Sequence, residues 1–362
     1  LQYIHALLID PDFGLMDNLM PQVLGQFPKL LKASGEDPDT PTLSSALAGP
    51  HRVEFLEAMK LEINELEQHG TWTVVPRASL PATVNVLPST WAFKNKREPD
   101  ERLRKFKARY CARGDRQVEG IDYFEKYAPV VSWTTVRLMI SLSINYGWAT
   151  RQVDFSNAFV QATLEEEVCL EMPAMFADEN LLGAEATVLK LNKSLYGLVQ
   201  APMCWYLFLK EALERNDFFV SEFDPCMFYG KGMVILVYVD DCLFFGPDLQ
   251  KINDFILDLE KQEMSLTKEQ DVYVFLGIQI ELDKKSGRYT LSQPGLIKKV
   301  LRTVGMEDCN GKATPAGSAP LGTDGDGEPF NEKWQYSSVV GMLLYLSSSS
   351  RPDIQFAVHQ CV

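Results

Sequence analysis

The sequence predicts an α+β fold, in which short strands and longer helices are mixed without a regular βαβ repeat. Apolar residues at helical spacing predict helices at 56–66 and 201–215, the second of which is rich in aromatic side chains. Seven consecutive apolar residues at 233–239 are followed by Asp240-Asp241 and then by a second apolar run. This pattern predicts a β-hairpin with two carboxylates at its tip.

The N-terminal half is expected to begin with a poorly structured segment, residues 1–50, because residues 34–50 have the Pro, Asp, Ser and Gly content of a linker. The first helix then ends near Gly70, since glycine is favoured immediately after a helix. Further elements are expected in this order: strands at 72–75, 91–96 and 104–112, a helix at 133–146 and a strand at 151–155.

The C-terminal half is expected to contain further helices and one more pair of strands. Pro294 marks the first turn of a predicted helix, because its fixed φ suits that position. Residues 315–329 are rich in Gly, Pro and Asp and predict a mobile loop. The expected elements are helices at 249–263 and 294–304, one strand at 272–282 paired with a strand at 289–292, and a partly helical segment at 334–358 that Arg351-Pro352 interrupts.

Chain length and composition exclude several classes of protein. The 362 residues, 46% of them hydrophobic, can bury a sizeable core divided between two or more subdomains. The longest apolar runs fall far short of the roughly 20 residues that span a membrane, so no membrane partner is expected. The N-terminus has no signal-peptide pattern, and its first residue is Leu rather than Met, which favours a fragment of a longer polyprotein.

The positions of cysteine and histidine argue against zinc sites, disulfides and histidine catalysis. The seven cysteines are scattered without a C-x-x-C pair, and none of the four histidines is grouped with another His or Cys. Scattered cysteines of this kind are typical of small buried side chains in a reducing compartment. Any bound metal should therefore be a hard cation held by carboxylates.

The formal charge of −14 argues against nucleic-acid binding, but the basic residues are unevenly distributed. Between Lys94 and Arg116, ten basic residues stand against four acidic ones. Two interpretations are open at this point. The segment is either a solvated, charged hairpin or a surface that binds phosphate groups.

Three aspartates are the clearest candidates for catalysis. Asp154 alone is typical of a turn or helix cap, and Asp240-Asp241 alone is typical of an acidic hairpin turn. If their strands are neighbours in one sheet, however, the three carboxylates converge. Such a cluster suits two Mg²⁺ ions roughly 3.5–4 Å apart and an in-line phosphoryl transfer. Because strand side chains alternate between faces, Asp240 is ranked above Asp241 as the direct ligand.

Several segments resemble the reverse transcriptases of copia-type retrotransposons, and they occur in the order found in that family. The residues from Tyr238 to Asp241 are similar to the Y-V-D-D box of reverse transcriptases, and they follow Asp154 as the family requires. The resemblance runs from about residue 50 to the end of the chain. The other resembling segments are WAFKNKR at 91–97, KARYCARG at 107–114, YFEKYAPV at 123–130, QVDFSNAF at 152–159, SLYGLVQAP at 194–202, DPCMF at 224–228 and FLGI at 275–278.

The resemblance implies a right-hand polymerase fold, with fingers and palm at 51–292 and a partial thumb or connection-like segment at 293–362 that stops before an RNase H domain. A palm sheet would carry the Y-V-D-D hairpin, and Asp154, Asp240 and Asp241 would be the catalytic triad and the ligands of two Mg²⁺ ions, or of Mn²⁺. The residues implied for nucleotide binding are Lys94, Lys107, Arg109, Phe159, Tyr196 and Gly197, and those implied for the primer grip are Phe275, Leu276 and Gly277.

Within these implied sites, Phe159 would exclude a ribose 2′-OH, and either Lys107 or Arg109 would meet the triphosphate. Without the resemblance, Phe159, Tyr196 and Phe275 would be interpreted as core residues. The implied activity is RNA-directed DNA polymerisation, in which dNTPs are added to a primer 3′-OH on an RNA or DNA template. RNase H and integrase regions are expected elsewhere in the full polyprotein. A cytoplasmic location is expected, in virus-like particles or with access to the nucleus, and the oligomeric state is left open.

Some positions depart from the family pattern. Val199 and Met203 stand where basic residues are usual, and Asp115 stands where an aromatic residue is common. Residues 264–274 lack the usual glycine. These departures weaken the expected phosphate contacts. They keep a second hypothesis open, a catalytically degenerate domain that binds nucleic acid or protein without turnover. A third, a template-independent nucleotidyl transferase or cyclase, fits the ordered segments least.

Overall fold

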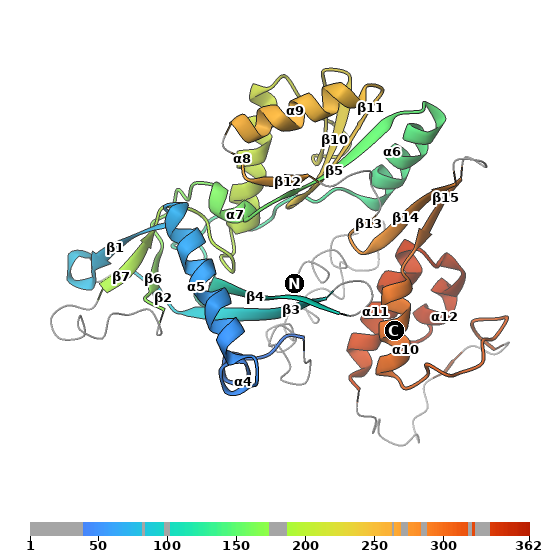
Figure 1. Ribbon diagram of the computed structural model, residues 1–362, viewed down its shortest axis with the longest axis horizontal. Coiled ribbons are helices and arrows are strands. Elements are labelled where there is room, and N and C mark those ends of the chain that lie inside the picture. Colours follow the sequence, from blue (N-terminus) through green and yellow to red (C-terminus); the bar gives the residue numbers. More distant parts are fainter. Residues whose placement is uncertain are drawn as a thin grey trace.

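Four sheets with helices packed against them make up the part of the chain that the computed structural model describes (Figure 1). The described residues are 39–81, 84–97, 102–173, 187–262, 264–268, 274–283, 288–317, 321–322 and 334–362. Short strands and longer helices follow one another along the chain without a βαβ repeat, so the predicted α+β class is confirmed. No helix within these residues is long and apolar enough to cross a membrane.

The largest sheet has six antiparallel strands. In spatial order they are β12 (Leu266–Lys268), β5 (Ala149–Phe155), β11 (Asp241–Gly246), β10 (Met233–Tyr238), β9 (Met227–Gly230) and β8 (Phe219–Val220). Nearly all residues of β10 and β11 are buried, as expected for continuous apolar strands. The helices that share this core are α6 (Trp133–Asn145), α8 (Ala201–Arg215) and α9 (Leu249–Lys261).

A long two-stranded hairpin, here called the basic hairpin, is formed by β3 (Ser89–Arg97) and β4 (Leu103–Ala112). Helices α4 (Leu43–Ala48) and α5 (Arg52–Gln68) pack against it. Phe55 and Met59 of α5 meet Phe93 and Ala108 of the hairpin in one buried cluster. A hairpin this long is marginal on its own, so the helices supply the apolar partner that it needs.

A four-stranded sheet lies next to this unit (Figure 1). Its spatial order is β1 (Trp72–Pro76), β7 (Thr187–Leu191), β6 (Cys169–Glu171) and β2 (Val86–Leu87), and only the β2–β6 pair is parallel. A short helix, α7 (Ala158–Gln161), follows β5 and shares the core of this sheet through Val160. Single 3₁₀ turns are formed by η1 (Arg77–Ser79) and η2 (Gly114–Arg116).

The C-terminal part contains a three-stranded sheet and a group of helices. The strands are β13 (Val274–Phe275), β14 (Ile278–Asp283) and β15 (Arg288–Ser292), and the helices are α10 (Pro294–Thr303), α11 (Tyr336–Ser349), η4 (Pro352–Ile354) and α12 (Gln355–His359). Helix α11 is tied to the larger sheet unit, because Arg137 of α6 donates 2.7 Å to the carbonyl of Ser348. A cation at this position also interacts favourably with the helix dipole.

Most predicted elements are confirmed, including the hairpin at Asp240-Asp241 and the helices around residues 56–66 and 201–215. Two predictions are wrong. Residues 43–48, within the expected linker, form helix α4, because the Thr42 hydroxyl caps it by accepting from the amide of Ser45. The expected single strand at 272–282 is instead a hairpin, because Leu276 and Gly277 adopt positive φ values of 51° and 77° and reverse the chain.

Other expectations fall partly outside the described residues. These include residues 1–38 of the N-terminal segment, residues 272–273 of the expected strand and most of the predicted loop at 315–329. The chosen domain limits, 1–50, 51–292 and 293–362, stay predictions.

Candidate active site

Asp154 and Asp241 lie directly opposite each other on neighbouring strands of the six-stranded sheet. Residues paired in this way across an antiparallel ladder share one face of the sheet. Asp240 directly precedes Asp241, in the two-residue turn that joins β10 to β11. Its carbonyl accepts a 2.8 Å hydrogen bond from the amide of Phe155, the residue after Asp154. The three aspartates are therefore brought together, as the sequence predicts if their strands are neighbours. Because Asp240 is in the turn, alternation between strand faces does not separate it from Asp241, and their ranking stays a prediction.

The turn that carries Asp240 is strained, and a hydrogen bond from helix α8 stabilises it. Val239, its first residue, has φ 54°, which is a rare conformation for a β-branched side chain. Trp205 of α8 donates from Nε1 to the carbonyl of Val239 at 2.7 Å. The Trp205 indole is buried and lies 5.2 Å from the ring of Phe155. Sequence reasoning placed Trp205 in a helix but gave no signal of this role, because the contact is made over a distance of 34 residues.

The three carboxylates concentrate negative charge at one point of the sheet. The thiol of Cys242 is fully buried there, and its pKa is raised first by burial and then by Asp241, Asp240 and Asp154. Like charges that lie directly opposite each other destabilise a sheet unless a cation offsets them. Carboxylate oxygens are the ligands that Mg²⁺ prefers, so the donor set fits this ion. Within the described residues, however, no three His, Cys, Asp or Glu side chains are close enough to hold a metal as they stand.

The basic hairpin has one cationic face and one apolar face. Lys94 is paired with Lys107 and Lys96 with Lys105, while Arg109 is opposite Ala92, so all five cations project to one side. The other side carries Phe93, Ala108 and Tyr110, which are buried against the helices. The sequence predicted basic strands, and the register adds that these five cations share one face.

Burial and, after it, mutual repulsion lower the pKa values of two lysines on this face. The pKa of Lys107 is lowered to about 8, first by burial and then by Arg109 and Lys96. The pKa of Lys96 is also lowered, mainly by burial and by Lys105, while Asp154 acts in the opposite direction. The influence of Asp154 indicates that Lys96 lies within electrostatic range of this aspartate. An anion bound to this face would relieve the repulsion among its cations.

Three of the residues implied for nucleotide binding are stacked together. The guanidinium of Arg109 lies 4.3 Å from the ring centre of Tyr196, and the ring of Phe159 meets Tyr196 edge-on at 5.0 Å. Burial is the main cause that raises the pKa of the Tyr196 hydroxyl, and Asp240 adds to it. The stack therefore lies between the basic hairpin and the aspartates, with Phe159 only five residues after Asp154.

Gly197 is required by close packing of two backbones. Its φ is 90°, and an added Cβ would lie 2.2 Å from the carbonyl oxygen of Ala112. A Cβ on Gly114 would in turn lie 2.1 Å from the carbonyl oxygen of Gly197. Next to this contact, the amide of Ala112 donates 2.8 Å to the carbonyl of Tyr196. The structure thus gives Gly197 a packing role, and its assignment to nucleotide binding stays a prediction.

The residues implied for the primer grip form a tight hairpin turn. Phe275 is fully buried, with its ring 6.1 Å from Trp133 and 6.3 Å from Tyr238, while Leu276 and Gly277 make the turn itself. The hydroxyl of Tyr345 on α11 donates 2.6 Å to the carbonyl of Leu276. Phe275 therefore packs the core beneath the turn, while Leu276 is partly buried and Gly277 is exposed.

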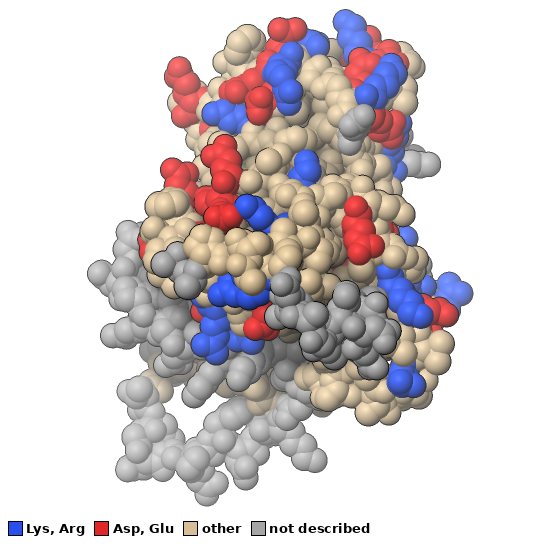
Figure 2. All heavy atoms as spheres, turned by 90° about the vertical axis from the view of Figure 1, so that its left-hand side faces the viewer, with Lys and Arg blue, Asp and Glu red and all other residues tan. Residues whose placement is uncertain are grey.

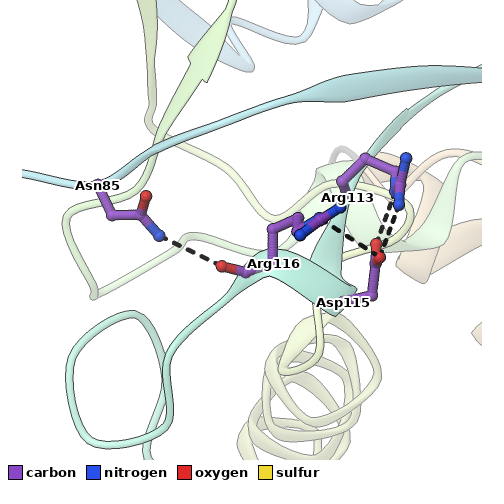
Figure 3. Close-up of polar contacts among 4 residues, drawn as sticks. All are labelled: Asn85, Arg113, Asp115 and Arg116. Atoms are coloured by element: carbon purple, nitrogen blue, oxygen red, sulfur yellow. Dashed lines mark hydrogen bonds and ion pairs between the residues drawn. The ribbon is translucent and has the colours of Figure 1, made fainter.

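Asp115 neutralises part of the basic segment, as Figure 3 shows. The guanidinium of Arg113 donates two hydrogen bonds of 2.7 Å to its carboxylate, and Arg116 lies 3.9 Å from it. The carbonyl of Arg116 also accepts from the side chain of Asn85 at 3.4 Å. Arg113 and Arg116 thus share one acidic partner within the chain. On the face drawn in Figure 2, basic and acidic side chains are interspersed, in keeping with the acidic net charge.

Glu62 is a buried carboxylate that sequence reasoning missed. It lies on the same stripe of α5 as Met59 and Ile63 and is only 6% exposed. Burial is the largest of the causes that raise its pKa to about 7, while the amide of Tyr110, Lys107 and Arg109 act in the opposite direction. The available signal was an acid next to Ile63 within an apolar stripe. Helical glutamates are so common that this signal was not distinctive.

Comparison with known proteins defines the class of protein. Residues 69–318 match the family described as reverse transcriptase (RNA-dependent DNA polymerase), and the chain belongs to that family.

The relatives identify the kind of reverse transcriptase. The chain is 33% identical over 334 residues to the retrovirus-related Pol polyprotein from transposon TNT 1-94 of Nicotiana tabacum, covering 89% of the chain and 25% of that polyprotein. It is 34% identical over 313 residues to the corresponding polyprotein from transposon RE2 of Arabidopsis thaliana, covering 84% of the chain and 20% of the relative. The transposon Ty1-NL2 Gag-Pol polyprotein of Saccharomyces cerevisiae is 24% identical over 323 residues, at 84% and 18% coverage. These are copia-type polyproteins, so the resemblance is confirmed, and the chain spans a quarter or less of their length.

Proposed function

We propose that the chain is the catalytic reverse transcriptase region of a copia-type polyprotein and that it extends a primer with dNTPs on an RNA or DNA template. One observation carries the proposal. Asp154 and Asp241 are paired in register, with Asp240 in the adjoining turn, and Arg109 of the cationic face contacts Tyr196, which in turn contacts Phe159, five residues after Asp154. Phosphoryl transfer to a primer requires carboxylates that hold metal ions and cationic side chains that bind the phosphate groups. In this assignment the six-stranded sheet is the palm and the basic hairpin belongs to the fingers.

Asp154 and Asp240 would be the direct ligands of two Mg²⁺ ions, or of Mn²⁺, with Asp241 supporting them. When bound, the ions would supply activation of the primer 3′-OH and neutralisation of charge on the leaving pyrophosphate. Trp205 would keep the turn in its strained conformation, so that the Asp240 carboxylate is positioned before substrate arrives.

The basic hairpin would bind the triphosphate of the incoming nucleotide. Lys107 and Arg109 share the cationic face with Lys94, and their charges would offset those of the phosphate oxygens. Phe159, held edge-on by Tyr196, would occupy the space that a ribose 2′-OH needs. The turn at Leu276 and Gly277 would contact the primer strand.

Primer extension by the purified chain on RNA and DNA templates tests the proposal. Incorporation should require Mg²⁺ or Mn²⁺ and should fall below detection in Asp240→Asn, which keeps the size of the side chain but removes its charge. Glu57→Gln, an exposed change on α5, serves as a control for the loss of one negative charge. Extension that survives Asp240→Asn would overturn the assigned chemistry.

A second candidate is a degenerate domain that binds nucleic acid or protein without turnover. The acidic net charge favours it, as does the engagement of Arg113 and Arg116 by Asp115. Retention of a labelled primer–template without any incorporation would support this candidate. Incorporation of even a few nucleotides would eliminate it.

The polyprotein context extends the proposal beyond the chain. RNase H and integrase activities would come from other regions of the same polyprotein, and template and primer would be met in the cytoplasm, within virus-like particles.

A further inference from the structure

Helix α5 lies immediately before the region that matches the reverse transcriptase family, which begins at residue 69. It nevertheless contacts both sides of the candidate nucleotide site. Figure 1 shows α5 crossing the basic hairpin, with its C-terminal end close to α7. Leu66 of α5, Tyr110 of β4 and Val160 of α7 belong to one buried cluster. The helix is therefore placed to fix the distance between the hairpin and the segment that follows Asp154.

The first contact is made by Glu62 on the edge of β4. Strand β4 pairs with β3 on one side only, so every second amide on its other edge needs a different acceptor. Glu62 Oε1 accepts from the amide of Tyr110 at 3.3 Å, and the carbonyl of Tyr196 accepts from the amide of Ala112. These bonds fix the edge of the strand that presents Lys107 and Arg109. A buried carboxylate is a costly acceptor where an apolar residue would pack well, so its presence points to a role in the site.

The second contact is made by Glu65, one helical turn further along the same helix. Glu65 Oε2 accepts from Nδ2 of Asn157 at 2.9 Å. Asn157 has a left-handed backbone conformation, with φ 51° and ψ 41°, and it directly precedes the short helix that begins with Ala158. Asn157 is three residues after Asp154 and two before Phe159. Its backbone conformation therefore sets the direction in which the chain leaves β5 toward Phe159.

The two contacts act on opposite ends of one stack. Glu62 fixes the strand of Arg109, Glu65 fixes the turn before Phe159, and Tyr196 lies between Arg109 and Phe159. We propose that Glu62 and Glu65 are positioning residues of the nucleotide site, Glu62 for the cations of β4 and Glu65 for the aromatic residue that faces the sugar. This inference rests on the proposed polymerase function, and it assigns roles to two residues outside the matched family region.

Glu62→Met tests the first role, because it removes the acceptor while filling the same space. The KM for dNTP should rise about tenfold with kcat nearly unchanged, since a small displacement of the cations weakens ground-state contact with the phosphates. The midpoint of thermal unfolding should be unchanged or higher, because replacing a buried charge by an apolar side chain is often stabilising. Glu62→Gln keeps an oxygen acceptor for Tyr110 and should restore the KM.

Glu65→Ala tests the second role through discrimination between nucleotides. The ratio of dNTP to rNTP incorporation should fall about threefold, which is the effect expected for the loss of one exposed hydrogen bond that orients Phe159. Glu65→Gln keeps the acceptor and should restore the ratio. Glu57→Gln, on the exposed side of the same helix, should change neither quantity.

Hydrogen exchange separates failure of this inference from failure of the polymerase assignment. The β4 segment should exchange faster in Glu62→Met and the segment around Asn157 should exchange faster in Glu65→Ala, whether or not the chain polymerises. A wild-type chain without incorporation would overturn the proposed function alone. Unchanged exchange, or a KM and a dNTP-to-rNTP ratio that stay at wild-type values in an active chain, would overturn the positioning roles. A rise in KM accompanied by a lower midpoint of thermal unfolding would also overturn them, because it would indicate a purely structural effect.

Discussion

The six-stranded sheet and the basic hairpin place opposite charges by different physical means. In the sheet, Asp241 begins a strand whose other five residues are all buried, and Asp154 lies between the buried residues Val153 and Phe155, so the packing of the core determines their position. In the hairpin, Lys107 and Arg109 sit on a two-stranded ribbon with only one covered face, and its free edge is held by a few single hydrogen bonds.

The difference indicates how each half of the site should respond to change. Carboxylates supported by a large core should keep their position when one neighbour is altered. Substituting a carboxylate itself should therefore lower kcat. Cations on the basic hairpin should move when one of its few supporting hydrogen bonds is removed. Substitutions there should therefore raise the KM for the nucleotide. Four predictions follow this contrast, from the largest expected effect to the smallest.

Asp154→Asn should lower kcat for primer extension by at least about 1,000-fold, because a metal-binding carboxylate contributes several kcal/mol to the transition state. The same change should leave the free energy of unfolding unchanged or raise it, since one of two like charges facing each other is removed. Single-turnover kinetics and chemical denaturation measure the two quantities. A marked loss of stability would contradict the view that the core alone holds this strand.

Glu62 should make the stability of the chain depend on pH. Its pKa in the folded chain is about 7, above the ordinary 4.5, so the folded state holds this proton more tightly than the unfolded state. Stability should therefore fall as the pH rises from 4.5 to 7, by roughly 3 kcal/mol relative to Glu62→Gln, and the difference should stay constant above pH 7. Urea denaturation of both proteins across this range checks the sign, and parallel curves would refute the buried carboxylate.

Trp205→Phe should lower kcat about tenfold, because the strained carbonyl of Val239 loses its donor and the Asp240 turn relaxes. The free energy of unfolding should fall by about 1–2 kcal/mol. Trp148→Phe, at the other end of β5, is the matched control and should leave kcat unchanged. Equal effects of the two substitutions on kcat would show that the indole contributes only volume.

Lys107 should make nucleotide binding weaken above pH 8. Its pKa is about 8, so its charge is present below that pH and is lost as the pH rises through it. The KM for dNTP should rise severalfold between pH 8 and about pH 9. Lys107→Arg keeps the charge at every accessible pH and should remove this dependence. A dependence that persists in Lys107→Arg would assign the titration to another group.

The sequence predicted those parts of the fold and site that depend on local pattern. Apolar runs around Asp240-Asp241 gave the hairpin, and helical spacing gave α5 and α8. Strands β6 and β7 were not predicted, because three- and five-residue segments acquire their conformation from partners far along the chain. Glu62 and Trp205 were missed for a related reason. Their roles depend on Tyr110 and Val239, which no local pattern connects to them.

The interlocked glycines at positions 114 and 197 have a mechanical consequence for the basic hairpin. A side chain on Gly114 would meet the backbone of Gly197, and a side chain on Gly197 would meet the backbone of Ala112, so the base of the hairpin and the loop at Gly197 are held in close contact. We therefore expect the basic hairpin to move toward a bound nucleotide by bending along β3 and β4, while the end of β4 at Ala112 stays fixed. Such bending would move Lys107 and Arg109 further than Ala112, which is held at Tyr196.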